Sequence, residues 1–171
     1  MFFDELPLAD EILDALWDMH FDECTPVQEH TIPVILDGKD VISCAQTGTG
    51  KTAAFGLPII QKIDLYSKNT EAVIICPTRE LCIQIANDCK KFAKYIPECS
   101  VVAVYGGASI EVQIKELKKG AKIIVATPGR INDLLERGKV DLSSIKYLVL
   151  DEADEMLNMG FKEDLDSILA Q

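Results

Sequence analysis

The sequence lacks several features that would assign it to particular classes of protein. No apolar run approaches the roughly 20 residues of a membrane-spanning helix, so we expect no transmembrane segment and no membrane partner. The stretch Met1–Glu5 is too short and too acidic to open a secretory signal, and we therefore expect a cytoplasmic protein. No linker rich in Pro, Gly or Ser interrupts the 171 residues. This continuity predicts one compact domain over residues 1–171.

Cysteines in metal-binding spacing are also missing. None of the six cysteines belongs to a C-x-x-C pair, which argues against a structural zinc site. Cys44 and Cys76 fall in apolar runs, and Cys82 and Cys89 lie seven residues apart on one predicted helix face. This pattern predicts reduced and mostly buried thiols.

Basic residues are scarce relative to acidic ones. The chain holds 17 Lys and Arg against 28 Asp and Glu, a net charge of −11, which at first argues against a nucleic-acid partner. The excess is concentrated in residues 1–40, where 11 acidic residues face one lysine for a net charge of −10. The rest of the chain is close to neutral and can carry a local basic face. The acidic segment itself can be read simply as solvated helix surface.

The stretch Ala45–Thr52 has the composition of a phosphate-binding loop. It follows the apolar run Val41–Cys44, which predicts a buried strand, and it precedes a helical pattern that begins at Lys51. A glycine-rich loop between a strand and a helix directs backbone N–H groups and the helix dipole at one point. The simpler reading is a flexible loop that contains a lysine by chance.

Individual residues of the loop have distinct expected roles. Gly48 and Gly50 permit backbone angles that other residues avoid. Lys51 is placed to reach the β- and γ-phosphates, and the Thr52 hydroxyl to coordinate Mg²⁺. The predicted nucleotide contacts in this loop are Thr47, Gly48, Thr49, Gly50, Lys51 and Thr52.

Apolar runs alternate with helical patterns along the chain. The first 40 residues predict two helices, one amphipathic and ending near His20, the other beginning at Thr25-Pro26 and ending before Gly38. The expected buried strands are 41–44, 72–76, 101–105, 123–126 and 147–150, and the expected helices between them are 51–66, 79–95, 110–119 and 129–137. Such alternation predicts an α/β fold, doubly wound, with a mostly parallel sheet and helices on both faces.

Unusual residues follow the predicted strands, at the edge where such sheets bind ligands. The apolar run 147–150 ends in Asp151 and Glu152, the arrangement that completes a phosphate-loop nucleotidase. Asp151 can hold Mg²⁺, and Glu152 can orient or deprotonate the attacking water, so Lys51, Asp151 and Glu152 are the predicted catalytic residues. An exposed acidic turn after a buried strand is the alternative.

These motifs together resemble the DEAD-box RNA helicases, specifically the first of their two RecA-like domains. The resemblance rests on Asp151–Asp154, on the phosphate loop with alanine at its first position, and on three further stretches in the expected order: Pro77–Leu81, Gly106-Gly107 and Thr127–Arg130. It implies ATP and Mg²⁺ as cofactors and an RNA-dependent ATPase that unwinds short duplexes. It also implies a monomer.

The resemblance extends to Phe21–Gln28, which is similar to the adenine-recognition motif of that family. The amide of Gln28 can donate to and accept from the adenine edge together, which would select ATP over GTP. By resemblance, Phe3 would stack on the base and Phe21 would lie beside it. His20 and Cys24 depart from the glycine and proline that are common in this motif.

The motifs that the resemblance assigns to RNA allow a physical interpretation. Thr78 and Thr127 stand where a strand gives way to a helix, so free N–H groups there can hold a backbone phosphate. Arg79 and Arg130 stand beside them. Contacts of this kind ignore base sequence. The alternative is that both threonines are ordinary helix caps and both arginines are solvated. The RNA-binding candidates are Pro77, Thr78, Arg79, Gly106, Gly107, Thr127, Pro128, Gly129 and Arg130.

The chain contains only three arginines, Arg79, Arg130 and Arg137, and no Ser-Ala-Thr motif. By resemblance, a second RecA-like domain would supply arginines worth about 10³–10⁵ in rate, so we expect residues 1–171 alone to be nearly inactive in hydrolysis. Two other functions stay open. One is a DNA-directed phosphate-loop ATPase, and the other is a non-catalytic scaffold that binds RNA or a partner through the acidic N-terminal segment.

Overall fold

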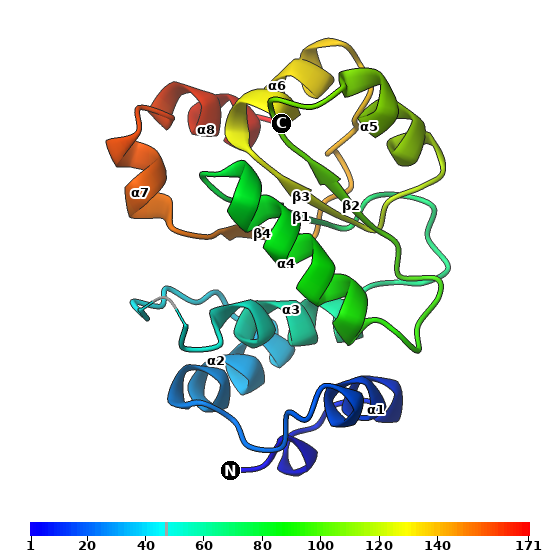
Figure 1. Cartoon of the computed structure of the whole chain (residues 1–171), viewed down its shortest axis with the longest axis vertical. Helices are drawn as coiled ribbons and strands as arrows, with labels where there is room; N and C mark the ends of the chain where they lie inside the picture. Colours follow the sequence, from blue (N-terminus) through cyan, green and yellow to red (C-terminus); the bar gives the residue numbers. More distant parts are fainter. Residues whose placement is uncertain (47) are drawn as a thin grey trace. The chain divides into compact units, whose positions relative to one another are not determined.

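A computed structural model describes residues 1–46 and 48–171. The predicted nucleotide contact Thr47 lies outside the described residues. The chain forms two compact units, one made of Met1–Ile63 and Asn87–Cys99, the other of Asp64–Ala86 and Ser100–Gln171. Helix α4 (Arg79–Phe92) contributes its first part to the second unit and its last part to the first. The fold is coloured along the chain in Figure 1.

The first unit is helical. It contains the 3₁₀ turn η1 (Phe3–Glu5) and the helices α1 (Asp10–Asp18), α2 (Pro26–Leu36) and α3 (Lys51–Lys62). Helix α2 begins at proline after Thr25, whose N–H donates to the Gln28 side chain at 2.9 Å, and this confirms the predicted start. Helix α1 ends in a left-handed turn at His20, with Phe21 N–H donating to Leu16 C=O at 2.9 Å.

The prediction of a buried strand at Val41–Cys44 was wrong. This run has no strand structure, Ile42 is 97% exposed, and Cys44 is exposed as well. Apolar composition predicts a strand only where a neighbouring strand offers hydrogen bonds, and the four described strands pair with one another instead. The phosphate loop therefore follows a segment without strand structure.

The second unit is built on a four-stranded parallel sheet. Its strands are β1 (Ala72–Ile75), β2 (Val101–Val104), β3 (Ile123–Ala126) and β4 (Tyr147–Leu150), in the order β2-β3-β1-β4. The register aligns the first residues of β1, β2 and β3, so that Ala72 and Val101 both pair with Ile123. Four of the five predicted strands are thus confirmed, as is the parallel α/β fold.

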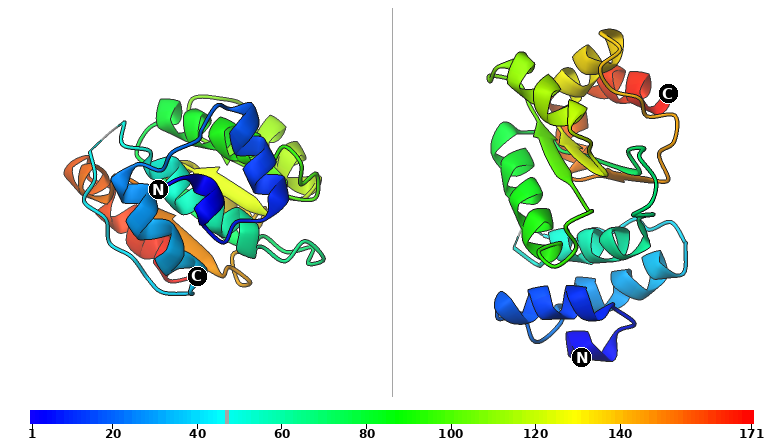
Figure 2. Two further views of the ribbon diagram at one scale, coloured as in Figure 1. Left: turned by 90° about the horizontal axis from the view of Figure 1, so that it is seen from below. Right: turned by 90° about the vertical axis from the view of Figure 1, so that its right-hand side faces the viewer.

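Helices cover both faces of this sheet. Val73 and Ile75 face a core that includes Ile131 and Leu134 of α6 (Pro128–Glu136), and α5 (Ile110–Lys118) packs against the same core. The unpredicted helices α7 (Ala153–Asn158) and α8 (Lys162–Leu169) close this side. On the other face, the Cys82 thiol of α4 lies 3.2 Å from the Val125 carbonyl oxygen. The right-hand view of Figure 2 shows α4 and α8 on opposite sides of the sheet.

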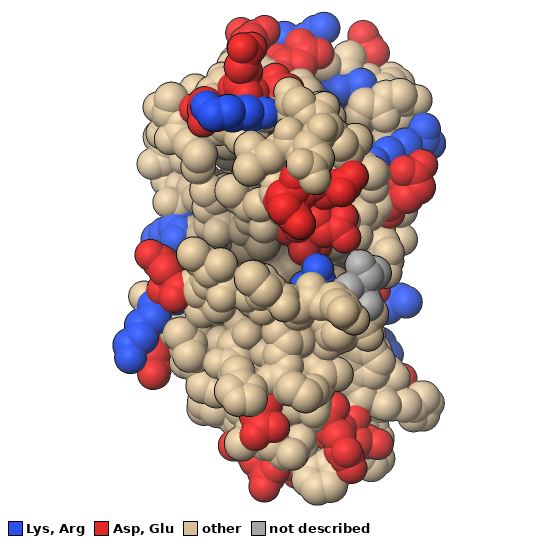
Figure 3. Space-filling view, turned by 90° about the vertical axis from the view of Figure 1, so that its left-hand side faces the viewer, with Lys and Arg blue, Asp and Glu red and all other residues tan. Residues whose placement is uncertain are grey.

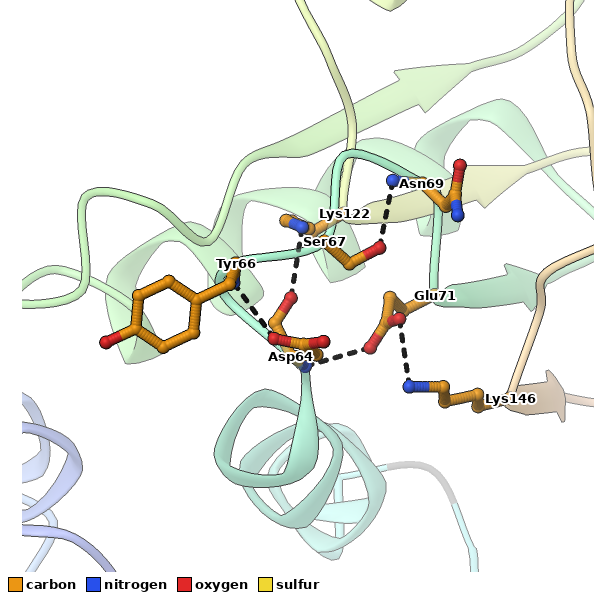
Figure 4. Close-up of polar contacts among 7 residues, drawn as sticks. All are labelled: Asp64, Tyr66, Ser67, Asn69, Glu71, Lys122 and Lys146. Atoms are coloured by element: carbon orange, nitrogen blue, oxygen red, sulfur yellow. Dashed lines mark hydrogen bonds and ion pairs between the residues drawn. The ribbon is translucent and has the colours of Figure 1, made fainter.

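A polar network supports the amino ends of the strands, at the edge opposite the predicted motifs (Figure 4). Buried Glu71 accepts from the Asp64 N–H at 2.8 Å and pairs with Lys146 at 3.2 Å. Lys122, also buried, donates to the Asp64 carbonyl at 3.0 Å. The carboxylate of Glu71 raises the pKa of Lys146 through this hydrogen bond. These contacts fix the loop before β1 rather than form a reactive site.

Among the described residues, no helix has the length and apolar character needed to span a bilayer. No disulfide links the six cysteines, and four of them are buried: Cys76, Cys82, Cys89 and Cys99. Burial raises the pKa of Cys89 to about 12, which keeps it a thiol at neutral pH.

Candidate functional site

The phosphate loop is shaped by two glycines with left-handed backbone angles. Gly48 has φ +84° and Gly50, the residue that caps α3, has φ +82°. A Cβ atom on Gly50 would lie 2.2 Å from the Gln28 side-chain nitrogen. Position 50 therefore requires glycine for its backbone angle and for its close approach to α2.

Two side chains of the Phe21–Gln28 segment hold the loop by its carbonyl groups. The Thr25 hydroxyl donates to the Thr49 carbonyl at 2.7 Å, and the Gln28 amide nitrogen donates to the Gly50 carbonyl at 3.1 Å. In a planar trans peptide the C=O of one residue and the N–H of the next point in opposite directions. The N–H groups of Gly50 and Lys51 therefore point away from α2, as a phosphate cradle requires.

The predicted adenine contacts differ in their accessibility. Gln28 is buried, and its amide uses one N–H on Gly50 and one lone pair on Thr25. One further N–H and one further lone pair remain within the capacity of a primary amide. Phe3 is only 3% exposed, whereas its neighbour Phe2 is 50% exposed. Phe21, at 41%, is an accessible ring.

The acidic pair lies at the carboxyl end of β4. The Asp151 N–H donates to the Ile75 carbonyl at 2.9 Å, which continues the β4–β1 ladder by one residue and fixes the backbone of Asp151. Glu152 follows with φ +55° and caps α7. A left-handed angle is unfavourable for a residue with a side chain and recurs at functional sites.

A buried thiol lies close to Asp151. Hydrogen bonding to Cys82, burial and the Asp151 carboxylate all raise the pKa of Cys76. Cys76 therefore stays a neutral thiol at neutral pH.

The first residues after β1 and β3 lie at the same edge of the sheet as Asp151. Cys76 N–H donates to Ala126 C=O at 3.0 Å, and Thr127 N–H donates to Val104 C=O at 3.1 Å. The Thr78 hydroxyl accepts from Leu81 N–H at 3.2 Å and so caps α4. Among the described residues the Thr127 side chain makes no such cap bond to α6. The cap interpretation thus applies to Thr78 and not to Thr127.

Both predicted RNA-binding arginines contact the loop that follows β2. Arg79 donates to the Gly107 carbonyl at 3.4 Å, and its guanidinium lies 5.3 Å from the centre of the Tyr105 ring. Arg130 donates to the Ala108 carbonyl at 3.1 Å. The structure therefore brings three predicted motifs together around one glycine loop: Pro77–Leu81, Gly106-Gly107 and Thr127–Arg130.

Gln113 is a buried member of this cluster that the sequence interpretation missed. Its side chain donates to the Tyr105 carbonyl at 3.1 Å and accepts from the Tyr105 N–H at 3.3 Å. Its oxygen also accepts from Arg130 at 2.8 Å. A signal was present, because Gln113 is a polar residue next to Ile114 on the apolar stripe of α5.

The predicted residues divide between the two units. The first unit contains the described phosphate-loop residues together with Phe3, Phe21 and Gln28. The second contains Asp151, Glu152 and all the predicted RNA-binding residues.

Comparison with known proteins matches the chain to one family. Residues 25–171 match the DEAD/DEAH box helicase family model. The chain is 54% identical over 171 residues to the ATP-dependent RNA helicase CshA of Limosilactobacillus reuteri, covering 100% of this chain and 34% of the relative. It is 46% identical over 169 residues to the ATP-dependent RNA helicase DeaD of Haemophilus influenzae, covering 99% of this chain and 28% of the relative.

A solved structure gives the same result. The crystal structure of a DEAD box protein from the hyperthermophile Methanococcus jannaschii superposes with a TM-score of 0.93 at 44% identity. The match covers 99% of this chain and 46% of that one. The chain thus spans about a third of the length of its curated relatives and about half of this structure.

Proposed function

Because the chain belongs to the DEAD/DEAH box helicase family, we propose that it binds ATP and RNA as part of an ATP-dependent RNA helicase. The observation that carries this proposal is the phosphate loop. Its carbonyl groups are held by Thr25 and Gln28, so that its N–H groups and the start of α3 point the opposite way. A pre-formed cradle at a helix start favours a bound triphosphate.

The roles of the nucleotide residues follow from their chemistry. Lys51 binds the terminal phosphates as a point charge. The second N–H and second lone pair of the Gln28 amide meet the adenine edge, and guanine presents the opposite donor and acceptor pattern. Phe21 offers an accessible ring for the base, and Phe3 stays a proposed stacking residue despite its burial.

The hydrolytic roles fall on Asp151 and Glu152. Glu152 orients or deprotonates the attacking water. Mg²⁺ usually keeps several waters and takes one or two protein oxygens in addition to phosphate. The Thr52 hydroxyl of the first unit and the Asp151 carboxylate of the second are each an oxygen donor that would be able to hold it. Among the described residues, no three His, Cys, Asp or Glu side chains form a cluster that could hold a metal ion. When bound, Mg²⁺ neutralises charge on the phosphates.

The RNA surface consists of the motifs at the carboxyl edge of the sheet in the second unit. Thr127, whose hydroxyl does not cap its helix, and the N–H groups at the start of α6 contact a backbone phosphate. Arg79 and Arg130 hold the Gly107 loop and have further N–H groups for the RNA. Binding through backbone groups is independent of base sequence.

A comparison of RNA and DNA tests this proposal. Fluorescence anisotropy measures the affinity of the chain for labelled single strands of RNA and DNA with one sequence, with and without a non-hydrolysable ATP analogue. We expect RNA to bind more tightly, and Thr127→Ala to weaken that binding relative to the surface variant Lys162→Ala. Equal affinity for the two strands would favour a DNA-directed ATPase. RNA binding without any binding of nucleotide would favour a scaffold.

A further inference from the structure

Three exposed aromatic rings line one pocket of the first unit, which we call the aromatic pocket and define by Phe2, Trp17, Phe21, Asp4, Asp14 and Asp22. Trp17 is 74% exposed, and it is the only tryptophan in the chain. Phe2 and Phe21 are also substantially exposed, and the cavity has a volume of about 430 Å³. Clustered exposed aromatic rings around a concave surface indicate an interaction site.

Backbone hydrogen bonds fix the position of the pocket. The Phe3 N–H donates to the Asp22 carbonyl at 3.0 Å, and the Cys24 N–H donates to the Met1 carbonyl at 2.9 Å. These contacts fasten the N-terminus to the segment after α1. The left-handed turn at His20 sets the direction in which the chain reaches Phe21. Binding to a pocket held in this way loses little conformational entropy.

Unpaired carboxylates surround the rings. Asp4, Asp14 and Asp22 form no ion pair and no side-chain hydrogen bond within the described part of the chain, whereas nearby Asp18 pairs with Lys94 at 2.6 Å. Residues 1–40 hold a single lysine and no arginine. On the face that Figure 3 draws, the lower end of the first unit carries Asp and Glu and no Lys or Arg. This charge repels a nucleic-acid backbone and attracts a cation.

We propose that the aromatic pocket binds an arginine side chain from a basic segment of a partner protein. A guanidinium can stack on the face of an aromatic ring while its N–H groups bind carboxylates, and the pocket offers both features side by side. Lysine makes a weaker match, because its ammonium lacks the planar face. The proposal does not rest on the proposed function, because Trp17 and the pocket aspartates have no role there. Phe3 and Phe21 also line the pocket and are shared with the proposed base contacts, so the test includes competition with ATP.

Peptide binding to the 171-residue chain tests this proposal. The peptide is a fluorescein-labelled octamer of alternating arginine and glycine, and the comparison peptide replaces arginine with glutamine. We expect only the arginine peptide to bind, with a change in Trp17 emission and a loss of affinity as NaCl rises. The double variant Asp14→Asn with Asp22→Asn should bind about fivefold more weakly, since exposed charge pairs contribute up to about 1 kcal/mol in total here.

Matched variants test whether peptide binding depends on the aromatic pocket rather than on exposed aromatic rings or negative charge elsewhere. Trp17→Ala should weaken the arginine peptide, while Tyr66→Ala, which removes an aromatic ring that is 98% exposed in the other unit, should not. Glu163→Gln serves as the control for charge. Circular dichroism verifies the fold, and ATP affinity should be equal in Trp17→Ala and the unmodified chain.

Several outcomes would overturn the proposal. They are equal binding of the glutamine peptide, unchanged affinity in Trp17→Ala, and displacement of the peptide by ATP, which would assign the pocket to the base of the nucleotide. Concentration-dependent dimerisation that is abolished by Trp17→Ala would instead make a second copy of the chain the occupant.

Discussion

At the scale of single residues, left-handed backbone angles mark the positions where local geometry matters most. Gly48 and Gly50 shape the phosphate loop, as their placement in the sequence predicted. His20 and Glu152 adopt the same region despite their side chains, at a cost of roughly 1–2 kcal/mol each. The left-handed angle at position 20 is one that glycine adopts without strain.

Gly50→Ala should disrupt nucleotide binding. The new methyl group would meet the Gln28 amide at 2.2 Å, so either the loop or Gln28 must move. We expect ATP affinity to fall about tenfold, since roughly 1–2 kcal/mol of strain and a lost hydrogen bond are involved. Gly120→Ala is the matched control, because it has φ +102° but open space around its Cβ position. If a fluorescent ATP analogue binds both variants equally, the contact between Gln28 and the loop has no role in binding.

Asp88 should make stability depend on pH in an unusual direction. Burial raises its pKa above the ordinary value of 3.8. A carboxyl group whose pKa is raised in the folded state contributes stability at low pH that is lost as the pH rises through that pKa. Asp88→Asn should therefore increase the free energy of unfolding at pH 7, and the difference should vanish below pH 3.8. Urea unfolding at both pH values measures this effect, and equal stability at pH 7 would contradict it.

At the scale of elements, the glycine loop after β2 is supported from three helices. Arg79 of α4, Gln113 of α5 and Arg130 of α6 all bind its backbone. The two arginines were predicted to face RNA, and in the structure both donate to carbonyl groups of this loop, which belongs to the proposed RNA surface. Gln113 binds both backbone groups of Tyr105, as a neighbouring strand would.

Gln113→Ala should weaken RNA binding without changing ATP affinity. The substitution removes the support for Tyr105 and leaves Arg130 with one fewer acceptor, so the loop loses its fixed position. Loss of three hydrogen bonds of about 1 kcal/mol each bounds the effect, and a decrease of about tenfold in RNA affinity is expected. Gln113→Glu keeps the acceptor for Arg130 but loses the donor to the Tyr105 carbonyl. Its RNA affinity should therefore lie between those of the unmodified chain and Gln113→Ala. Fluorescence anisotropy with labelled RNA measures the first affinity, and titration with ATP measures the second. Equal losses of RNA affinity and ATP affinity would indicate general unfolding.

At the scale of the whole molecule, the sequence predicted the parallel α/β fold and four of its strands, because continuous apolar runs are typical of strands in a covered parallel sheet. Three of these strands are largely buried as predicted, whereas β4 is not, and its Leu148 is 43% exposed. The same rule failed at Val41–Cys44, where apolar residues are exposed without a strand partner. Pairing is a long-range property that a local pattern does not contain. The role of Gln113 was not predicted for a similar reason. Its partners Tyr105 and Arg130 are identified only when the fold is known.

Competition between nucleotides tests the proposal that this chain binds ATP as part of an RNA helicase. A fluorescent ATP analogue is bound to the 171-residue chain and displaced with ATP or with GTP, in the presence of Mg²⁺. ATP should displace the analogue at clearly lower concentrations than GTP, and Lys51→Ala should abolish binding of the analogue. Equal displacement by the two nucleotides, or unchanged binding by Lys51→Ala, would contradict it.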